Sequence, residues 1–169
     1  MKKPLVSIVM NCYNSDRFLK VAIDSIYAQT YVSWEIIFWD NGSTDKSSEI
    51  AQNYDNRLKY YRTSKTTELG EARNLALKEA NGEYLAFLDC DDLWMPNKLK
   101  LQVAMLEKKT DFQFCYGGVH YIDEYGNKLR DTMPNAKSGY TIKQQLDSFE
   151  IGIQSVLIRN NIYLFFDDG

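Results

Sequence analysis

The sequence predicts an α/β protein built on one mostly parallel sheet that carries helices on both faces. Apolar segments of strand length alternate with helix-like segments over four units, which is the pattern of right-handed crossover connections. The first apolar segment, residues 5–10, is hydrophobic almost throughout, as expected of a strand buried on both faces. Ligands of such sheets bind beyond the carboxyl ends of the strands, so polar residues at those ends are the first candidates for a site.

Length and composition indicate one ordinary globular domain. The 169 residues are 44% hydrophobic and 25% charged, and the net charge is −3. That charge argues against a protein that binds nucleic acid through its phosphates. We find no signal peptide and no stretch of the ~20 apolar residues that a membrane span requires, and we expect a cytoplasmic protein. The odd number of cysteines, with no C-x-x-C pair, is typical of reduced thiols and gives no zinc site.

The elements of the first half follow from local signals. Asn14-Ser15-Asp16 can cap a helix, and Leu19, Ala22, Ile23 and Ile26 then keep the i, i+3, i+4, i+7 spacing of one buried face. Further along we expect strands at 34–39, 58–62 and 84–88, and helices at 44–54 and 69–80, the second of them ended by Asn81-Gly82.

The second half begins with a helix whose first turn suits Pro96 and whose inner face is marked by Leu99, Val103 and Leu106. After it we expect a strand at 112–116, a hairpin over 119–130 that turns at Tyr125-Gly126-Asn127, a helix near 141–149 and a strand near 154–158.

Three polar clusters lie at predicted carboxyl ends of strands: residues 11–14, 40–45 and 89–92. Because parallel strands end at the same edge of a sheet, the three clusters should meet there. Three such coincidences are hard to attribute to solvated loops alone. This edge is therefore the predicted site.

The third cluster, Asp89-Cys90-Asp91-Asp92, crowds three carboxylates onto one strand end. Like charges at this spacing repel one another, so solvent, a basic side chain or a bound cation must compensate. Two carboxylates in a D-x-D arrangement can share a hard divalent cation with phosphate oxygens and water. We expect such an ion to neutralise a diphosphate. The alternative is that Asp91 and Asp92 only cap the turn before Pro96.

Three further side chains could contact a nucleotide. Asp40 could accept a hydrogen bond from a base or ribose, or be an ordinary turn aspartate before Asn41-Gly42. Arg73 could bind the anionic diphosphate, or pair with nearby glutamates on the surface. Tyr13 could stack on a base, or line the core.

Four motifs, in order and with fitting spacing, resemble those of glycosyltransferase family 2: VSIVMNCYN at 6–14, DNGSTD at 40–45, GEARN at 70–74 and FLDCDD at 87–92. The segment WMPNKL at 94–99 fits as well. The resemblance is strong over 5–106 and looser beyond. It implies a single GT-A (Rossmann-like) domain over 1–169, in which 1–110 is the nucleotide-sugar-binding half and 111–169 begins an acceptor half that is truncated.

The resemblance also implies an activity: transfer of a sugar from a nucleoside-diphosphate sugar, usually of UDP or dTDP, with the help of Mn²⁺ or Mg²⁺. The acceptor would be a glycan or a lipid-linked molecule in cell-surface polysaccharide biosynthesis, and the reaction would be inverting. Carried onto the matching residues, Tyr13 packs on the base and Asp40 hydrogen-bonds it. Arg73 meets the base or diphosphate, Asp89 approaches the ribose or metal, and Asp91 binds the metal.

The resemblance also implies that Asn14, in the first motif, binds the nucleotide sugar. Asp92 would lie near the metal, and no separate role is assigned to it. The chain departs from the common family pattern twice. Asn11-Cys12 stands where Pro-Thr or Pro-Ser is common, and Asn41 stands where a second Asp is common. Both departures leave the donor base open.

The end of the sequence bears on catalysis. Inverting members of the family use a carboxylate as general base, in an acidic motif beyond a Phe-Asp-Glu-like stretch. The terminal Phe166-Asp167-Asp168-Gly169 resembles that stretch. We expect the base beyond Gly169, with Asp167 and Asp168 as weaker candidates.

Two rival functions remain from the sequence. One is a nucleotide-sugar-binding fragment without turnover. The other is a metal-dependent phosphatase of the haloacid dehalogenase type, which also uses D-x-D but usually carries it on the strand that opens the chain. We expect no nucleic-acid partner and no transmembrane segment, whereas peripheral association with a membrane would suit a lipid-linked acceptor.

Overall fold

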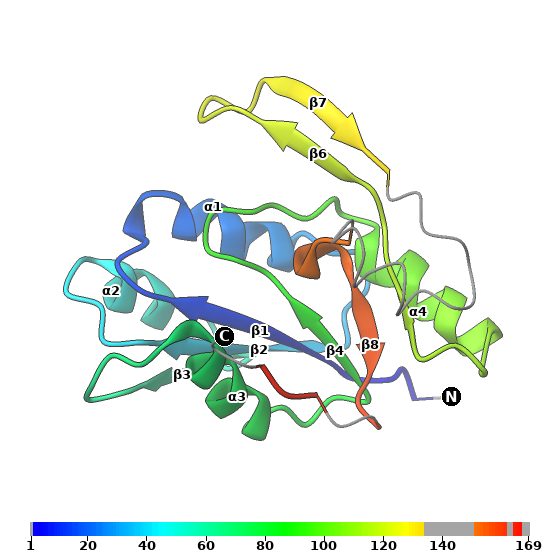
Figure 1. The fold of residues 1–169 in the computed structure, drawn as a ribbon, viewed down its shortest axis with the longest axis horizontal. Coiled ribbons are helices and arrows are strands. Elements are labelled where there is room, and N and C mark those ends of the chain that lie inside the picture. The colour runs from blue at the N-terminus through cyan, green and yellow to red at the C-terminus, as the bar shows by residue number, and fades with distance from the viewer. Residues whose placement is uncertain (1, 134–150, 162–163, 167–169) are drawn as a thin grey trace.

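The structure is a computed structural model that describes residues 2–133, 151–161 and 164–166. Within them, a six-stranded sheet forms the centre of the molecule (Figure 1). In sheet order the strands are β3 (Leu58–Arg62), β2 (Trp34–Asp40), β1 (Val6–Cys12), β4 (Tyr84–Phe87), β8 (Leu157–Arg159) and β5 (Phe114–Cys115). The strands β1 to β4 pair in parallel, whereas β8 is antiparallel to both β4 and β5. The predicted α/β class with a mostly parallel sheet is confirmed.

Helices cover both faces of this sheet. They are α1 (Asp16–Tyr27), α2 (Ser47–Gln52), α3 (Leu69–Lys78) and α4 (Lys98–Lys108). Because side chains alternate along a strand, Val6, Ile8 and Met10 of β1 share one core cluster with α1, α2 and α4. Val9 faces the other way and joins Ala76 of α3 in a second cluster. In Figure 1, α1 lies above the sheet and α3 below it.

Several elements are shorter than the predicted ranges; the strand expected at 112–116, for example, pairs only over Phe114–Cys115. The helix expected at 44–54 is only α2, because the Asp45 carboxylate accepts hydrogen bonds from the N–H groups of Ser47 (2.9 Å) and Asp16 (2.9 Å) and holds the preceding residues in a turn. The strand expected near 154–158 begins as a 3₁₀ turn, Ile153–Ser155, and pairs only as β8. The helix expected near 141–149 lies outside the described residues.

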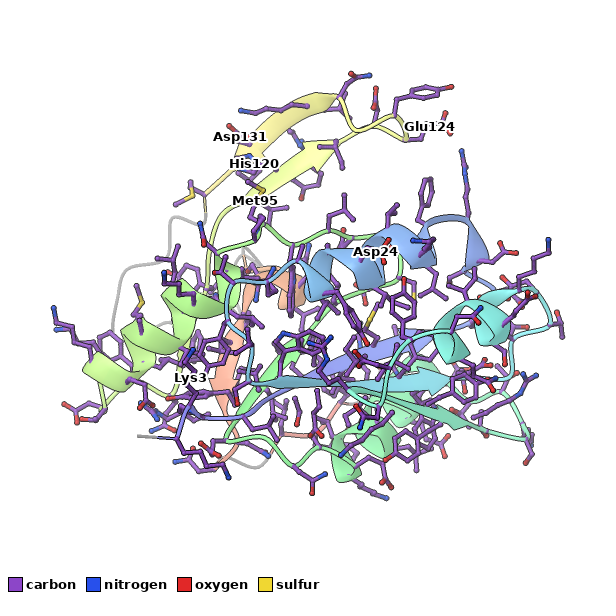
Figure 2. All side chains as sticks on the ribbon, turned by 180° about the vertical axis from the view of Figure 1, so that it is seen from behind. Lys3, Asp24, Met95, His120, Glu124 and Asp131 are labelled. Atoms are coloured by element: carbon purple, nitrogen blue, oxygen red, sulfur yellow. The ribbon has the colours of Figure 1, made fainter. Side chains whose placement is uncertain are left out.

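The predicted hairpin is confirmed as β6 (Val119–Ile122) and β7 (Lys128–Thr132), which form a separate two-stranded sheet. It stands over the α1 side of the body (Figure 1), and an Arg17–Glu124 ion pair joins its turn to α1. Figure 2 shows His120 and Asp131 side by side on the hairpin, and their side chains interact at 2.5 Å. The one histidine of the chain is therefore engaged on the hairpin and not at the edge of the main sheet.

A closed polar network lies at the amino end of the parallel strands. Glu35 is 6% exposed; it accepts hydrogen bonds from the Ser7 hydroxyl (2.6 Å) and the Asn81 N–H (3.0 Å) and pairs with Lys59 (2.6 Å). The Ser7 oxygen in turn accepts the N–H of Gly82 (2.8 Å). A Cβ on Gly82 would lie 2.5 Å from the Ser7 backbone nitrogen, so this approach requires glycine.

Strands β5 and β8 come from beyond residue 110 and complete the same sheet as the first 110 residues. The sheet thus crosses the boundary that the sequence suggests between two halves. In the part of the chain that the structure describes, no helix is both long and apolar enough to cross a bilayer.

Candidate nucleotide-sugar site

The three predicted polar clusters meet at the carboxyl edge of the sheet. Asn14 links the first cluster to the second: its N–H donates to the Ser43 hydroxyl (3.0 Å) and its side-chain oxygen accepts the Thr44 N–H (2.8 Å). The third cluster reaches the first through the Cys90 thiol, which donates to the Asn11 carbonyl (3.3 Å). Hydrogen bonds therefore join residues from three separate strand ends.

Asn14 also sets the path of the loop that carries Tyr13. Its φ of 49° is in the left-handed region, which asparagine tolerates better than most residues. With its side chain held by the next loop, Asn14 acts as a positioning residue. Tyr13, immediately before it, is 53% exposed, so its ring is available to a ligand.

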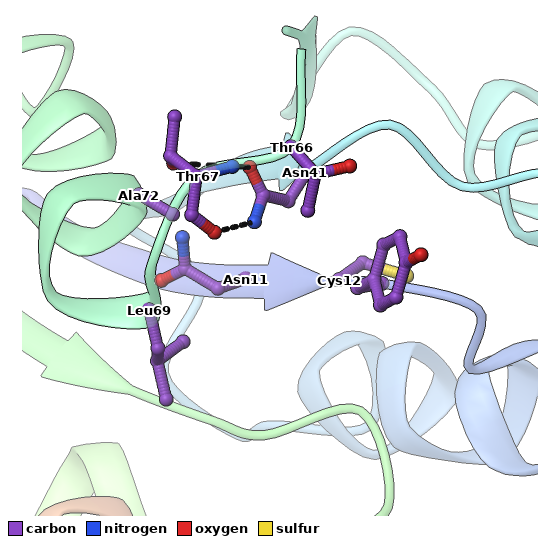
Figure 3. A pocket seen from close by; sticks show the side chains of 8 residues that line it. Asn11, Cys12, Asn41, Thr66, Thr67, Leu69 and Ala72 are labelled. Atoms are coloured by element: carbon purple, nitrogen blue, oxygen red, sulfur yellow. Dashed lines mark hydrogen bonds between the residues drawn. The ribbon is translucent and has the colours of Figure 1, made fainter.

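A pocket of about 210 Å³ lies between the end of β1 and the start of α3 (Figure 3). It is lined by Asn11, Cys12, Tyr13, Asn41, Thr66, Thr67, Leu69 and Ala72. The Asn41 amide holds the far wall, since it donates to the Thr67 carbonyl (2.7 Å) and accepts the Thr67 N–H (3.1 Å). The Asn11 amide nitrogen, in contrast, is buried and has no hydrogen-bond partner among the described residues.

Asp40 is fully buried beneath this surface. One carboxylate oxygen accepts the Ser43 N–H (2.7 Å), and the other accepts the Tyr60 hydroxyl (2.5 Å) and lies 3.3 Å from Arg62. In this structure Asp40, which the sequence predicts to contact the base, is therefore not exposed to a ligand. Its neighbour Asn41 lines the pocket instead.

The carboxylate cluster carries the electrostatic strain that its sequence suggests. Asp91 is exposed and Asp89 is partly exposed. Burial, followed by the charges of Asp89 and Asp91, raises the pKa of Asp92 to about 6. Arg73 offers partial compensation from α3, with its guanidinium 3.4 Å from an Asp89 oxygen.

The segment that ends at Phe166 is fixed beside this cluster. The Asn74 amide donates to the Phe166 carbonyl (2.8 Å) and accepts its N–H (2.9 Å), and the Phe166 ring packs edge-on against Phe87. The Arg73 guanidinium lies 5.4 Å from the centre of the same ring. The candidate bases Asp167 and Asp168, which follow, lie outside the described residues.

The carboxylates fit a shared divalent cation better than a preformed metal cage. Among residues 2–133, 151–161 and 164–166, no three metal-ligating side chains converge on one point. Asp89 and Asp91 can supply carboxylate oxygens, and Mg²⁺-like cations often take their remaining ligands from water and substrate phosphates. The crowding of three carboxylates at one strand end, with only Arg73 beside Asp89 among the described residues, favours a cation, because positive charge there would relieve the repulsion.

The sequence pointed to Tyr13, Asn14, Arg73 and the Asp cluster, all of which lie at this edge. It missed Tyr60 and Arg62, the partners of Asp40, and the pocket wall at Thr66 and Thr67. The wall had one signal, a polar pair just before the GEARN motif. Tyr60 and Arg62 gave none, because they alternate like any half-exposed strand.

Comparison with known proteins gives a family and several relatives. The family model described as glycosyl transferase family 2 matches residues 7–162. An uncharacterized glycosyltransferase of Methanocaldococcus jannaschii is 33% identical over 96% of this chain and 58% of its own length. The Escherichia coli UDP-Glc:alpha-D-GlcNAc-diphosphoundecaprenol beta-1,3-glucosyltransferase WfgD is 38% identical over 70% of this chain and 47% of its own. The chain thus spans about half the length of the curated relatives it matches.

Solved structures share the fold. TarS 1–349 of S. aureus in complex with UDP-GlcNAc superposes with a TM-score of 0.73 at 22% identity, over 91% of this chain and 45% of TarS 1–349. The mannosyltransferase PcManGT of Pyrobaculum calidifontis, in complex with GDP-Man and Mn²⁺, gives a TM-score of 0.60 at 24% identity, over 73% and 37% of the two chains. At these identities the likeness concerns the fold, which is GT-A. On the match of the family model over residues 7–162, this chain belongs to glycosyl transferase family 2.

Proposed function

We propose that the carboxyl edge of the sheet binds a nucleoside-diphosphate sugar and a divalent cation for transfer of the sugar with inversion. The observation that carries the proposal is the juxtaposition of an open pocket beside an exposed Tyr13 with three crowded carboxylates that Arg73 compensates only in part. A nucleoside diphosphate would place its base at the pocket and its phosphates, with the cation, at the carboxylates. We propose UDP or dTDP as the nucleotide, and the relative WfgD, which is named for UDP-Glc, supports this choice.

Each side chain then has a distinct part. Tyr13 stacks on the base, and Asn14 fixes the loop that carries Tyr13. Arg73 binds the diphosphate, where it exchanges Asp89 for phosphate oxygens. Asp91 and Asp89 hold the cation, and Mn²⁺ or Mg²⁺ would stabilise the charge of the departing nucleoside diphosphate.

Asp40 is proposed to act on the base through the loop it closes. The direct contact that the sequence predicts would require Asp40 to release Tyr60 or Arg62, and a buried carboxylate that loses its partners is costly. The loop in question ends at Ser43, whose hydroxyl also accepts the Asn14 N–H. A change at Asp40 would therefore reach Tyr13 by way of Asn14.

The acceptor and the general base are proposed from the relatives. WfgD is named for a diphosphoundecaprenol-linked acceptor, and we propose a glycan or lipid-linked acceptor here, in cell-surface polysaccharide biosynthesis. Such an acceptor would suit a cytoplasmic enzyme that associates with the membrane at its periphery. Because the relatives are about twice as long, we propose that the general base lies in the part they have beyond this match, with Asp167 and Asp168 as alternatives.

The test is calorimetric titration of the chain with UDP and with dTDP, each with and without Mn²⁺, followed by mass spectrometry of products from the corresponding sugar donors. We expect binding that depends on metal, and nucleoside diphosphate as the released product, formed slowly by this chain alone. Release of inorganic phosphate would instead identify a phosphatase. Binding without any product would identify a binding fragment, and binding of neither nucleotide would overturn the proposal.

A further inference from the structure

The segment 94–99, which follows the carboxylate cluster, has no place among the proposed ligand contacts, yet it is held closely on the α1 side. The Ser25 hydroxyl accepts the Trp94 N–H (3.1 Å), and the Gln29 amide donates to the Met95 carbonyl (2.9 Å). Trp94 is only 6% exposed. The loop between the carboxylates and α4 is therefore packed against the body of the protein.

The same region also binds residues 154–156, which come more than fifty positions later in the chain. Three side chains donate to three successive carbonyl groups there: Trp94 Nε1 to Gln154 (3.0 Å), Gln102 Nε2 to Ser155 (2.8 Å) and Lys98 Nζ to Val156 (3.4 Å). The donors contact one another as well, since the Lys98 ammonium lies 4.0 Å from the centre of the Trp94 ring and donates to the Gln102 amide oxygen (2.8 Å). Together they hold the backbone that leads into β8.

Residues from beyond position 150 contact both flanks of the carboxylate cluster at 89–92. At one flank Gln154 holds Trp94, two positions after the cluster ends. At the other flank the Phe166 ring packs against Phe87, two positions before the cluster begins. Between these contacts β8 pairs with β4, the strand that leads into the cluster (Figure 1). The carboxylates therefore lie on a loop that is anchored on both sides by a later part of the chain.

We propose that Trp94 is a positioning residue for the metal-binding carboxylates and that its bond to Gln154 holds them in place, an inference that rests on the proposed metal site. Asp91 and Leu93 are exposed, so Trp94 is the buried anchor that follows them. Like charges at 89–92 repel one another and favour a wider loop, which an anchor at Trp94 resists. Because Mg²⁺-like cations demand near-ideal geometry, a loop that is fixed before the ion arrives should bind it more tightly.

A positioning role and a purely structural role predict different results. Loss of a contact that only stabilises the fold would lower the free energy of unfolding and weaken all ligand binding alike. Loss of the Trp94 hydrogen bond should instead loosen residues 88–93 and weaken only the binding that depends on metal.

The first experiment measures hydrogen exchange of the metal-free chain by mass spectrometry in Trp94→Phe, which keeps an aromatic ring and removes the indole N–H. Exchange of the peptide that carries residues 88–93 should become faster by about two- to tenfold, which corresponds to one net hydrogen bond. Trp39→Phe is the matched control, because the Trp39 Nε1 is buried without a partner among the described residues, and it should leave that peptide unchanged. Unchanged exchange at 88–93 in Trp94→Phe would overturn the inference, and so would equally faster exchange along the whole chain.

The second experiment measures UDP affinity by calorimetry as Mn²⁺ is added. In Trp94→Phe the Mn²⁺ concentration at half effect should rise by about two- to tenfold, while the affinity for UDP without metal stays that of the wild-type chain. Gln102→Ala, which releases the neighbouring Ser155 carbonyl, should shift the Mn²⁺ dependence in the same direction, whereas Trp39→Phe should not shift it.

A loss of UDP affinity in Trp94→Phe that is equal with and without Mn²⁺ would assign Trp94 to the fold alone. If the wild-type chain binds neither UDP nor Mn²⁺, the proposed function fails by itself. The exchange measurement uses no ligand, so it still decides whether Trp94 positions the carboxylates.

Discussion

The two ends of the parallel strands differ in how fully their buried polar side chains are hydrogen-bonded. At the amino end, Glu35 is buried and bonded to Ser7, Lys59 and the Asn81 backbone. At the carboxyl end, the Asn11 amide nitrogen is buried without a partner among the described residues, and the pKa of Asp92 is raised by burial and like charges. Buried polar groups without partners cost stability, so a site that retains them holds them for something else. On the proposed function, the difference separates groups that stabilise the fold from groups that would contact a ligand.

Asp40 shows that the carboxyl edge also contains a side chain whose contacts stabilise the fold. Like the carboxylate of Glu35, that of Asp40 is fully engaged. It accepts hydrogen bonds from Ser43 and Tyr60 and pairs with Arg62. Position at the edge is thus not enough to identify a ligand contact. A better criterion is whether the polar atoms of the side chain already have hydrogen-bond partners within the protein. The following variants test this criterion.

The largest expected effect is at Asp91. The Asp91→Ala variant should lose the part of UDP affinity that depends on Mn²⁺, because it removes an exposed carboxylate proposed to bind the cation. Its thermal stability should stay close to that of the wild-type chain, since relief of like-charge crowding offsets the lost side chain. Calorimetry with and without Mn²⁺ measures the first effect. Asp111→Ala, an exposed aspartate after α4, is the matched control and should bind normally. Equal affinity of the Asp91 variant and the wild-type chain in Mn²⁺ would exclude the metal role.

The second test compares Ser7→Ala with Asn11→Ala, one variant from each end of β1. Ser7→Ala should lower the free energy of unfolding by about 1–3 kcal/mol, because the Gly82 N–H and Glu35 lose a buried partner. Asn11→Ala removes an amide that has no partner to lose and should change stability by less than ~0.5 kcal/mol. Urea unfolding measures both. The order should reverse for UDP affinity, which Asn11→Ala weakens and Ser7→Ala leaves unchanged. If both variants destabilise the chain equally, the two ends do not differ as we infer.

The same two regions show how much of the structure could be predicted from the sequence. The parallel strands β1 to β4 and their helices follow from local alternation and spacing, so they were predicted closely. A strand near 154–158 was expected as well, but its antiparallel pairing with β4 was not, because that pairing joins residues more than seventy positions apart in the chain. At the site, exposed candidates such as Tyr13 were recognisable by residue type and position. The closure of Asp40 was not, since it depends on where Tyr60 and Arg62 of the neighbouring strand β3 happen to point.

The third test asks whether Asp40 belongs with the folding groups. Tyr60→Phe removes only the hydroxyl that donates to Asp40 and should destabilise the chain by about 0.5–1.5 kcal/mol. If Asp40 acts through its loop, Tyr60→Phe should also weaken UDP binding, in the same direction as Asp40→Asn and by less. A double-mutant cycle in urea should show that the two changes are coupled. Loss of UDP affinity in Asp40→Asn alone, with Tyr60→Phe normal in binding, would favour direct contact with the base.

The smallest effect is a difference in pH dependence between the two ends. Burial opposes ionisation of Glu35, but hydrogen bonds from Lys59 and Ser7 outweigh it and leave the pKa of Glu35 below its usual 4.5. A lowered pKa contributes stability that is present above pH 4.5 and is lost as the pH falls through the folded-state value. The contribution of Asp92 to stability depends on pH in the opposite direction. Its pKa is raised from 3.8 to about 6, so its contribution is present below pH 3.8 and is lost as the pH rises through about 6.

Glu35→Gln and Asp92→Asn therefore make a matched pair in metal-free buffer. Relative to the wild-type chain, Asp92→Asn should gain stability as the pH rises from about 4 to 7, by on the order of 1 kcal/mol after solvent screening. Glu35→Gln should be less stable than the wild-type chain at neutral pH, and that deficit should shrink as the pH falls below about 4.5. Urea unfolding across this range measures both slopes. Mn²⁺ with UDP should abolish the advantage of Asp92→Asn, because the cation then balances the ionised cluster. Slopes of the same sign for the two variants would show that the carboxylates at the two ends are held in the same way.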